Sequence, residues 1–110
     1  MSVYMHKEFA RLRQHLLAFS AECERSIENA QNALLSLDVG LARKLVAYDR
    51  IIDQQEVDIE EECLKVMALY QPVAADLRQV VAILKMNTDL ERIADLSGNI
   101  GEYVVQLAAM

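Results

Sequence analysis

The fold is decided by the apolar spacing within Phe9-Ala10-Arg11-Leu12-Arg13-Gln14-His15-Leu16-Leu17-Ala18-Phe19-Ser20-Ala21-Glu22-Cys23. Apolar side chains recur there at every third or fourth position, and the pattern continues to residue 37. This spacing places them on one face of an α-helix. We therefore predict one long amphipathic helix over residues 3–37. Its expected core face is Phe9, Leu12, Leu16, Phe19, Cys23, Ile27, Ala30, Leu34 and Leu37.

Two further stretches have the same spacing. Asp38 is a good N-cap for a second helix over residues 39–70, and Pro72 suits the first turn of a third helix over residues 72–107. Three glycines and one proline in 110 residues are too few for the turns of a sheet. The third helix has a line of uncharged residues expected to face the core: Val73, Leu77, Val81, Leu84 and Thr88.

Short connections make consecutive helices antiparallel neighbours. The sequence therefore predicts an all-α protein, an elongated antiparallel three-helix bundle of the spectrin-like up-down-up kind. We expect a single domain over residues 1–110.

Composition excludes several classes of protein. The net charge of −6 argues against nucleic-acid binding, which needs a basic surface. No apolar run approaches the roughly 20 residues of a membrane span, and the first residues do not read as a signal peptide. Cys23 and Cys63 form no CxxC pair and have no neighbouring histidine, so we expect free thiols rather than a zinc site. These features predict a soluble cytoplasmic protein.

Two pairs of acidic residues attract attention. Asp49 and Asp53 form one pair, Glu91 and Asp95 the other, each within the pattern acid-Arg-Ile-x-acid. A spacing of four residues puts both carboxylates of a pair on one helix face, one turn apart. If the second and third helices form a hairpin centred on Gln71, the two pairs lie at the same height, with Asp53 opposite residues 89–91 and Asp49 opposite residue 93.

Four carboxylates at one level are a plausible ligand set for a hard cation: iron(III), magnesium, calcium or manganese. The absence of histidine at that level argues against zinc and against a di-iron site built from Glu-x-x-His. The alternative is that Arg50 and Arg92 pair with these acids at the surface, where each ion pair contributes about 1 kcal/mol at most.

Three segments also carry a family resemblance. They are Tyr48-Asp49-Arg50-Ile51-Ile52-Asp53 with Glu56, Ile59 and Glu60; then Ala68-Leu69-Tyr70-Gln71-Pro72-Val73-Ala74-Ala75-Asp76-Leu77-Arg78; then Asp89-Leu90-Glu91-Arg92-Ile93-Ala94-Asp95. Together they resemble the PhoU family of phosphate-signalling regulators, over nearly the whole chain. The family usually has Gly-Asp-His where this chain has Ala94-Asp95-Leu96, so the resemblance keeps the carboxylate and loses the histidine.

The resemblance implies a three-helix repeat whose acid-x-x-x-Asp motifs bind metal, often iron, in some members. Those motifs correspond to Asp49 with Asp53 and to Glu91 with Asp95. It further implies a cytoplasmic negative regulator of phosphate homeostasis, not an enzyme, acting between the ATPase of the phosphate ABC transporter and a phosphate sensor kinase. Typical members carry two repeats in tandem. We therefore expect a homodimer or a second repeat to cover part of this one, and the chain to be either a fragment or a single-repeat member.

Two other classes stay open at this point. One is a structural helical interaction module that binds no metal. The other is a carboxylate-bridged metal store or metalloenzyme, which would normally use histidine ligands as well. A phosphotransfer role for His15 is a more distant possibility, since Arg11 is its sole basic support.

Overall fold

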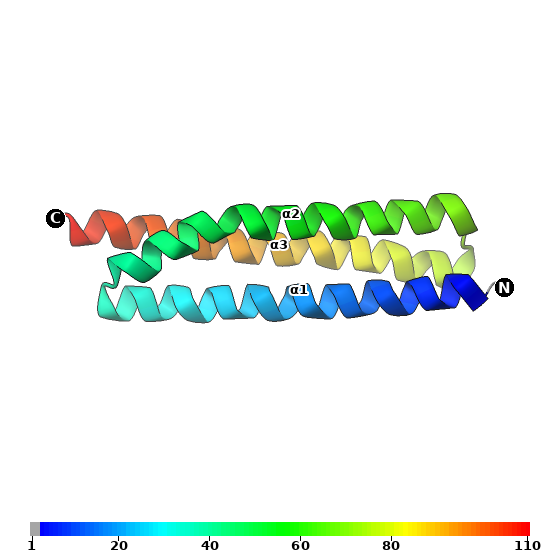
Figure 1. Cartoon of the computed structure of the whole chain (residues 1–110), viewed down its shortest axis with the longest axis horizontal. Helices are drawn as coiled ribbons and strands as arrows, with labels where there is room; N and C mark the ends of the chain where they lie inside the picture. The colour runs from blue at the N-terminus through cyan, green and yellow to red at the C-terminus, as the bar shows by residue number, and fades with distance from the viewer. Residues whose placement is uncertain (1–2) are drawn as a thin grey trace.

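The computed structural model describes residues 3–110, and within that range it contains three helices and no strand. They are α1 (Val3–Ser36), α2 (Val39–Tyr70) and α3 (Ala74–Ala108). The helices lie side by side in antiparallel order along a rod of 60 × 17 × 17 Å (Figure 1). The prediction of an all-α three-helix bundle is confirmed. Residues 1 and 2 of the predicted domain lie outside the described residues.

Both turns are closed by backbone hydrogen bonds. After α1, Leu37 adopts a left-handed φ of 47°, and the Asp38 N–H donates to the carbonyl of Ala33 at 3.0 Å. The Asp38 side chain accepts from the Leu41 N–H at 3.0 Å, so it caps α2 as expected. After α2, Gln71 has a φ of 44°, and its N–H donates to Met67 at 3.1 Å.

The start of α3 differs from the prediction. Val73 is extended, with φ −129° and ψ 164°, and the helix begins at Ala74 rather than Pro72. The hairpin loop therefore occupies residues 71–73, and its centre lies later in the chain than Gln71. This small shift matters because it changes which residues of α2 and α3 stand opposite each other.

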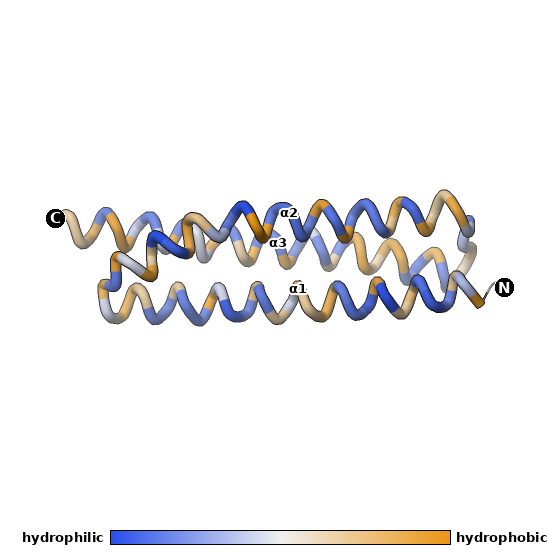
Figure 2. Tube along the Cα trace, in the orientation of Figure 1, coloured by the Kyte–Doolittle hydropathy of each residue, from blue (hydrophilic) through white to orange (hydrophobic). Residues whose placement is uncertain are grey.

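Hydrophilic and hydrophobic residues alternate along all three helices, as amphipathic helices require (Figure 2). The main core runs along the bundle axis, and a smaller cluster rich in alanine lies near the α1–α2 turn. That cluster contains Ala30, Ala33, Ala42, Leu45 and Val104. Small side chains there let the helices approach closely, which leaves no room for larger ones.

The last part of the predicted α1 core is wrong for this reason. Leu34 and Leu37 are 45% and 51% exposed, and Ile27 is partly buried. Ala33 and Ser26 are buried in their place.

The predicted core line of α3 is also wrong. Val73 and Leu77 are 72% and 37% exposed, Thr88 is exposed, and Val81 and Leu84 are only partly buried. The face that packs against α1 and α2 is instead Val80, Ile83, Asn87, Ala94, Ser97, Gly101 and Val104. Several of these residues are small or polar, so a pattern of large apolar residues points to the neighbouring face. The predicted line runs along the outer edge of the bundle.

None of the helices within residues 3–110 has a stretch long and apolar enough to cross a membrane.

Candidate metal site

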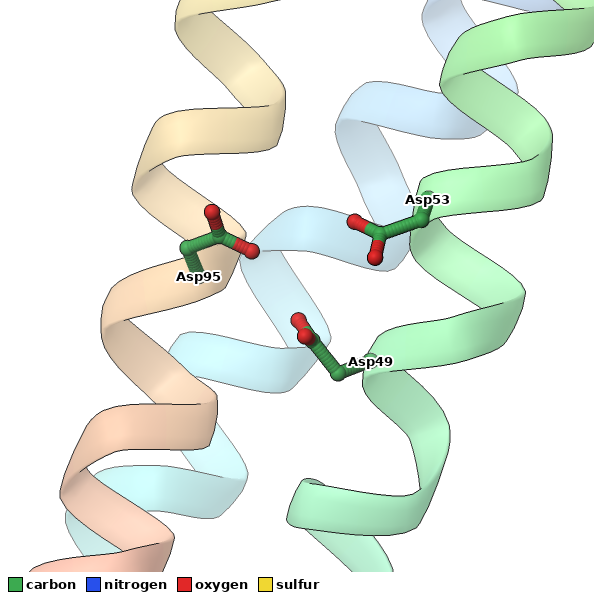
Figure 3. Close-up of side chains that lie close together, drawn as sticks. All are labelled: Asp49, Asp53 and Asp95. Atoms are coloured by element: carbon green, nitrogen blue, oxygen red, sulfur yellow. The ribbon is translucent and has the colours of Figure 1, made fainter.

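Three aspartates converge at the edge where α2 meets α3. Asp49 and Asp53 come from α2 and Asp95 comes from α3, and each offers a carboxylate oxygen that lies within 4.8 Å of those of the other two. Figure 3 shows all three carboxylates turned toward the space between the two helices. Asp49 and Asp95 are partly buried, and Asp53 is exposed. Within residues 3–110 no other cluster of His, Cys, Asp or Glu is this compact.

The pairing across the helices is shifted from the predicted one. Asp49 lies beside Asp95 and Gly98 rather than opposite residue 93: a Cβ built on Gly98 would be 3.7 Å from the Asp49 Oδ1. The shift follows from the later start of α3. It places Asp49 of the α2 pair directly opposite Asp95 of the α3 pair.

Glu91, the fourth predicted ligand, lies outside the group of three. It is partly buried, and its carboxyl is within hydrogen-bonding reach of Asp95 and Asp53. Burial, followed by the hydrogen bond to Asp95, raises the pKa of Glu91 to about 7. Glu91 therefore borders the three aspartates and is electrostatically linked to them.

Asp49 has a perturbed pKa as well. Burial is again the main cause, and the adjacent Asp95 carboxyl and the charges of Asp53, Asp95 and Glu102 add to it, raising the pKa of Asp49 to about 6. Like charges at this separation favour retention of a proton. At neutral pH and without a cation, the protein thus holds these carboxylates in an unfavourable arrangement.

Two acids near the site were not among the predicted ligands. Glu56 has its pKa raised by burial and then by the charges of Glu60, Asp53 and Asp95. Glu102 lines a groove of about 190 Å³ together with Val46, Asp49, Asp95, Gly98 and Asn99. A sequence signal existed for both: Glu56 follows Asp53 by three residues, about one turn along the same face of α2, and Glu102 follows Asp95 by seven residues, two turns along the same face of α3.

The basic residues do not neutralise the site. Among the described residues the ion pairs are Arg11–Glu8, His15–Glu62 and Arg92–Asp89, the last at 3.9 Å. Arg92 thus pairs with Asp89 instead of with a predicted ligand, and Arg50 is exposed. The Oδ1 of Asp49 is buried and has no hydrogen-bond partner among the described residues.

The donor set is all oxygen. Carboxylates of this kind suit magnesium, calcium, manganese or iron(III), and the uncompensated charge and orphaned Asp49 oxygen fit such an ion. Cys23 is close enough for Glu91 to influence it, but burial raises the pKa of its thiol to about 11, so it stays protonated. The site consequently lacks a soft ligand.

A second groove lies on the α1–α2 side of the bundle. It has a volume of about 490 Å³ and includes His15, whose Nδ1 is 2.8 Å from the Glu62 Oε2. Glu22, which also lines this groove, accepts hydrogen bonds from the Tyr48 hydroxyl at 2.7 Å and from the Gln55 Nε2 at 3.1 Å. His15 is therefore already paired, and the groove is separate from the carboxylates of α2 and α3.

Comparison with known proteins places the chain in a family. Residues 16–104 match the PhoU domain. The chain is similar to proteins named phosphate-specific transport system accessory protein PhoU homolog from Pseudomonas aeruginosa (38% identity over 107 residues) and Aquifex aeolicus (38% over 104 residues). A homolog 1 of that name from Thermotoga maritima is 35% identical over 106 residues.

These alignments cover nearly all of this chain, 97%, 94% and 96% in the same order. They cover only 44%, 47% and 46% of the relatives, so the chain spans less than half of their length. The match to the domain over most of the chain, together with this identity, shows that the chain belongs to the PhoU domain family.

Proposed function

We propose that this chain is a non-enzymatic cytoplasmic regulator of phosphate uptake and phosphate-starvation signalling, and that it binds a hard metal cation at the α2–α3 edge. Family membership and the names of the relatives, accessory proteins of phosphate-specific transport, support the regulatory role. The observation that carries the metal is the buried Oδ1 of Asp49, which lacks a partner in a group of three aspartates without a neighbouring cation.

Each acid has a distinct part in this proposal. Asp49, Asp53 and Asp95 supply ligand oxygens, and Glu91 lies next to them as a fourth ligand or as a hydrogen-bond partner. A bound cation of iron, magnesium, calcium or manganese supplies the positive charge that the protein itself does not place there. Because the ligands come from two helices, the cation also joins α2 to α3.

The partners follow from the same family. We propose the ATPase of the phosphate transporter and the phosphate sensor kinase as the proteins on which this regulator acts. A second PhoU repeat or a second copy would cover apolar side chains that are now exposed on α2, on α3 and in the loop between them: Val57, Leu64, Val73 and Leu77, at 42%, 52%, 72% and 37%. The greater length of the relatives is consistent with additional structure beside this bundle.

A complementation assay tests the role. In a bacterium that lacks its own phosphate-transport accessory protein, this chain should restore repression of a phosphate-starvation reporter in phosphate-rich medium. The double variant Asp49→Asn/Asp95→Asn should fail, while Asp58→Asn should succeed, because Asp58 is exposed and bonds only Gln54 among the described residues. Cell extracts should contain equal amounts of all three proteins.

The outcomes separate the remaining alternatives. If the double variant represses as well as the wild type, the chain acts as a helical interaction module and the metal is dispensable. Turnover of peroxide or a phosphoester by the metal-loaded protein would favour a metalloenzyme instead. Failure of the wild type to repress would contradict the regulatory role.

A further inference from the structure

The buried face of α3 contains an asparagine, Asn87, between the apolar residues Ile83 and Ala94. Asn87 is 1% exposed, and its Nδ2 donates to the backbone carbonyl of Glu56 at 2.9 Å. Its Oδ1 has no partner among the described residues. A buried polar group that satisfies only part of its hydrogen-bonding capacity costs stability, so this residue calls for a reason other than stability.

The position of the Asn87 hydrogen bond suggests that reason. Asn87 precedes Glu91 by one turn of α3, and Glu56 follows Asp53 by about one turn of α2. The bond therefore ties the two helices together directly beside the carboxylates. Beyond the site, Gly101 packs so closely on α2 that a Cβ there would lie 2.7 Å from the carbonyl oxygen of Ala42.

Apolar contacts alone fix the sliding of one helix along another only weakly, because the hydrophobic effect is non-directional. In coiled coils a single buried asparagine selects one register at a cost in stability. A slip of one turn displaces a helix by about 5.4 Å. That displacement exceeds the 4.8 Å within which the three aspartate oxygens lie, so a slip of one turn would take Asp95 out of the group that it forms with Asp49 and Asp53.

We infer that Asn87 is a positioning residue: its bond to the Glu56 carbonyl fixes the register of α3 against α2 and so assembles the carboxylates that face each other across that interface. The consequence for metal binding rests on the proposed function. The fixed register does not depend on the proposed function, and it can be measured without metal.

The test uses Asn87→Leu, which keeps the number of side-chain heavy atoms and the branching at Cγ and removes the hydrogen bond. Spin labels are attached to Lys44→Cys on α2 and Lys85→Cys on α3, which are both exposed sites. The distance between the two labels, measured by pulsed electron paramagnetic resonance, reports the register of the helices. The native Cys23 and Cys63 are 1% and 0% exposed and escape labelling. Thermal unfolding and titration with Mn²⁺ complete the measurements.

We expect Asn87→Leu to unfold at the same temperature as the wild type or higher, since an unsatisfied polar group is removed. The single spin-label distance of the wild type should broaden or split by about 5 Å. The affinity for Mn²⁺ should fall about tenfold or more, as is typical when residues that orient metal ligands are replaced. If Asn87 had a merely structural role, its substitution would lower the unfolding temperature and leave the spin-label distance unchanged.

Ser97→Ala is the matched control. Ser97 is also buried on α3, at 2% exposure, and its Oγ has no partner among the described residues. Its removal should leave the spin-label distance and the affinity for Mn²⁺ unchanged, with an unfolding temperature equal to that of the wild type or higher. If Asn87→Leu does not fold, Asn87→Ala loses the same bond without adding bulk and is interpreted in the same way. An unchanged, narrow distance in the folded variant overturns the inference. Absence of Mn²⁺ binding by the wild type, with the distance altered in the variant, contradicts only the metal proposal.

Discussion

Carboxylate oxygens of Asp49 on α2 and Asp95 on α3 lie within 4.8 Å of each other across the helix interface. The two residues stand opposite each other because the α2–α3 loop spans residues 71–73 and α3 starts at Ala74. Asp53 and Glu91 lie within hydrogen-bonding reach one turn away. The packing of α2 against α3 thus places the acidic side chains of the two helices next to each other.

The apposed acids make the stability of the metal-free protein depend on pH. Their pKa values are raised from ordinary values of 3.8 and 4.5 to about 6 for Asp49 and about 7 for Glu91. The folded protein therefore holds protons that the unfolded chain releases at lower pH. These two groups stabilise the fold most below about pH 4, and this contribution is lost as the pH rises through 6 and 7.

Thermal unfolding in EDTA, followed by circular dichroism, measures this dependence. The unfolding temperature should decrease from pH 5 to pH 8. The double variant Asp49→Asn/Glu91→Gln should show a flatter profile over the same range. A wild-type unfolding temperature that rises between pH 5 and pH 8 would contradict the raised pKa values.

Removing one charge should relieve part of the repulsion. We expect Asp49→Asn to raise the free energy of unfolding at pH 8 by a few tenths of a kcal/mol to about 1 kcal/mol, the scale of a like-charge contact on helices. The gain should be much smaller at pH 4, where the Asp49 carboxyl is protonated in the folded state and no longer repels its neighbours. Urea unfolding at the two pH values measures it, and Asp58→Asn serves as the exposed control on the same helix. A loss of stability at pH 8 would show that Asp49 is satisfied in the metal-free protein.

Binding of a cation should release protons. A metal ligand must be deprotonated, so the ion displaces protons that Asp49 and Glu91 retain near neutral pH. Titration calorimetry with Mn²⁺ at pH 6.5, in buffers that differ in ionisation enthalpy, measures the number released. We expect a net release at pH 6.5 that decreases by pH 8.5, and an affinity that increases over the same range. A binding enthalpy that does not vary with the buffer would contradict proton displacement.

The two glycines of α3 should respond in opposite ways to alanine. A Cβ on Gly101 would meet the Ala42 carbonyl oxygen at 2.7 Å, so Gly101→Ala forces the backbones of α2 and α3 apart. We expect it to lower the free energy of unfolding by about 1–3 kcal/mol, the usual cost of overpacking. On Gly98 the nearest atoms are those of Asp49 at 3.7 Å, an ordinary contact. Gly98→Ala should therefore gain up to about 1 kcal/mol from helix propensity.

Urea unfolding of both variants at pH 5, where Asp49 and Glu91 are largely protonated, tests this contrast. Equal effects of the two substitutions would show that the close approach at Gly101 is not present in solution.

The sequence predicted α2 most accurately. Its boundaries and its Asp38 cap agree with the structure, and the large apolar residues Leu45, Ile52 and Ile59 are buried along it. Hydropathy does not predict the buried face of α3, because Asn87 and Gly101 on that face are not large apolar residues. Asn87 makes a hydrogen bond to the Glu56 carbonyl, and Gly101 allows a close approach to the Ala42 backbone.

The candidate site was predictable in its residues and not in its geometry. The spacing of each acidic pair shows which acids share a helix face, but their opposition depends on where α3 restarts after Pro72. That start depends on the extended conformation of Val73, which no periodicity signals. The sequence predicts Glu91 as a fourth ligand at the height of Asp53; the structure has Glu91 beside Asp53 and Asp95 but outside the group of three aspartates.

Direct titration with Mn²⁺ at pH 7.5, followed by calorimetry and by elemental analysis of the same samples, tests the central claim most directly. The wild type and Asp58→Asn should bind Mn²⁺ alike, and at a free concentration of 100 times the Kd the ion should add about 2.7 kcal/mol to the free energy of unfolding. Asp49→Asn/Asp95→Asn should bind none while keeping its helical content. Equal binding by the double variant, or no binding by the wild type, would contradict a cation site between α2 and α3.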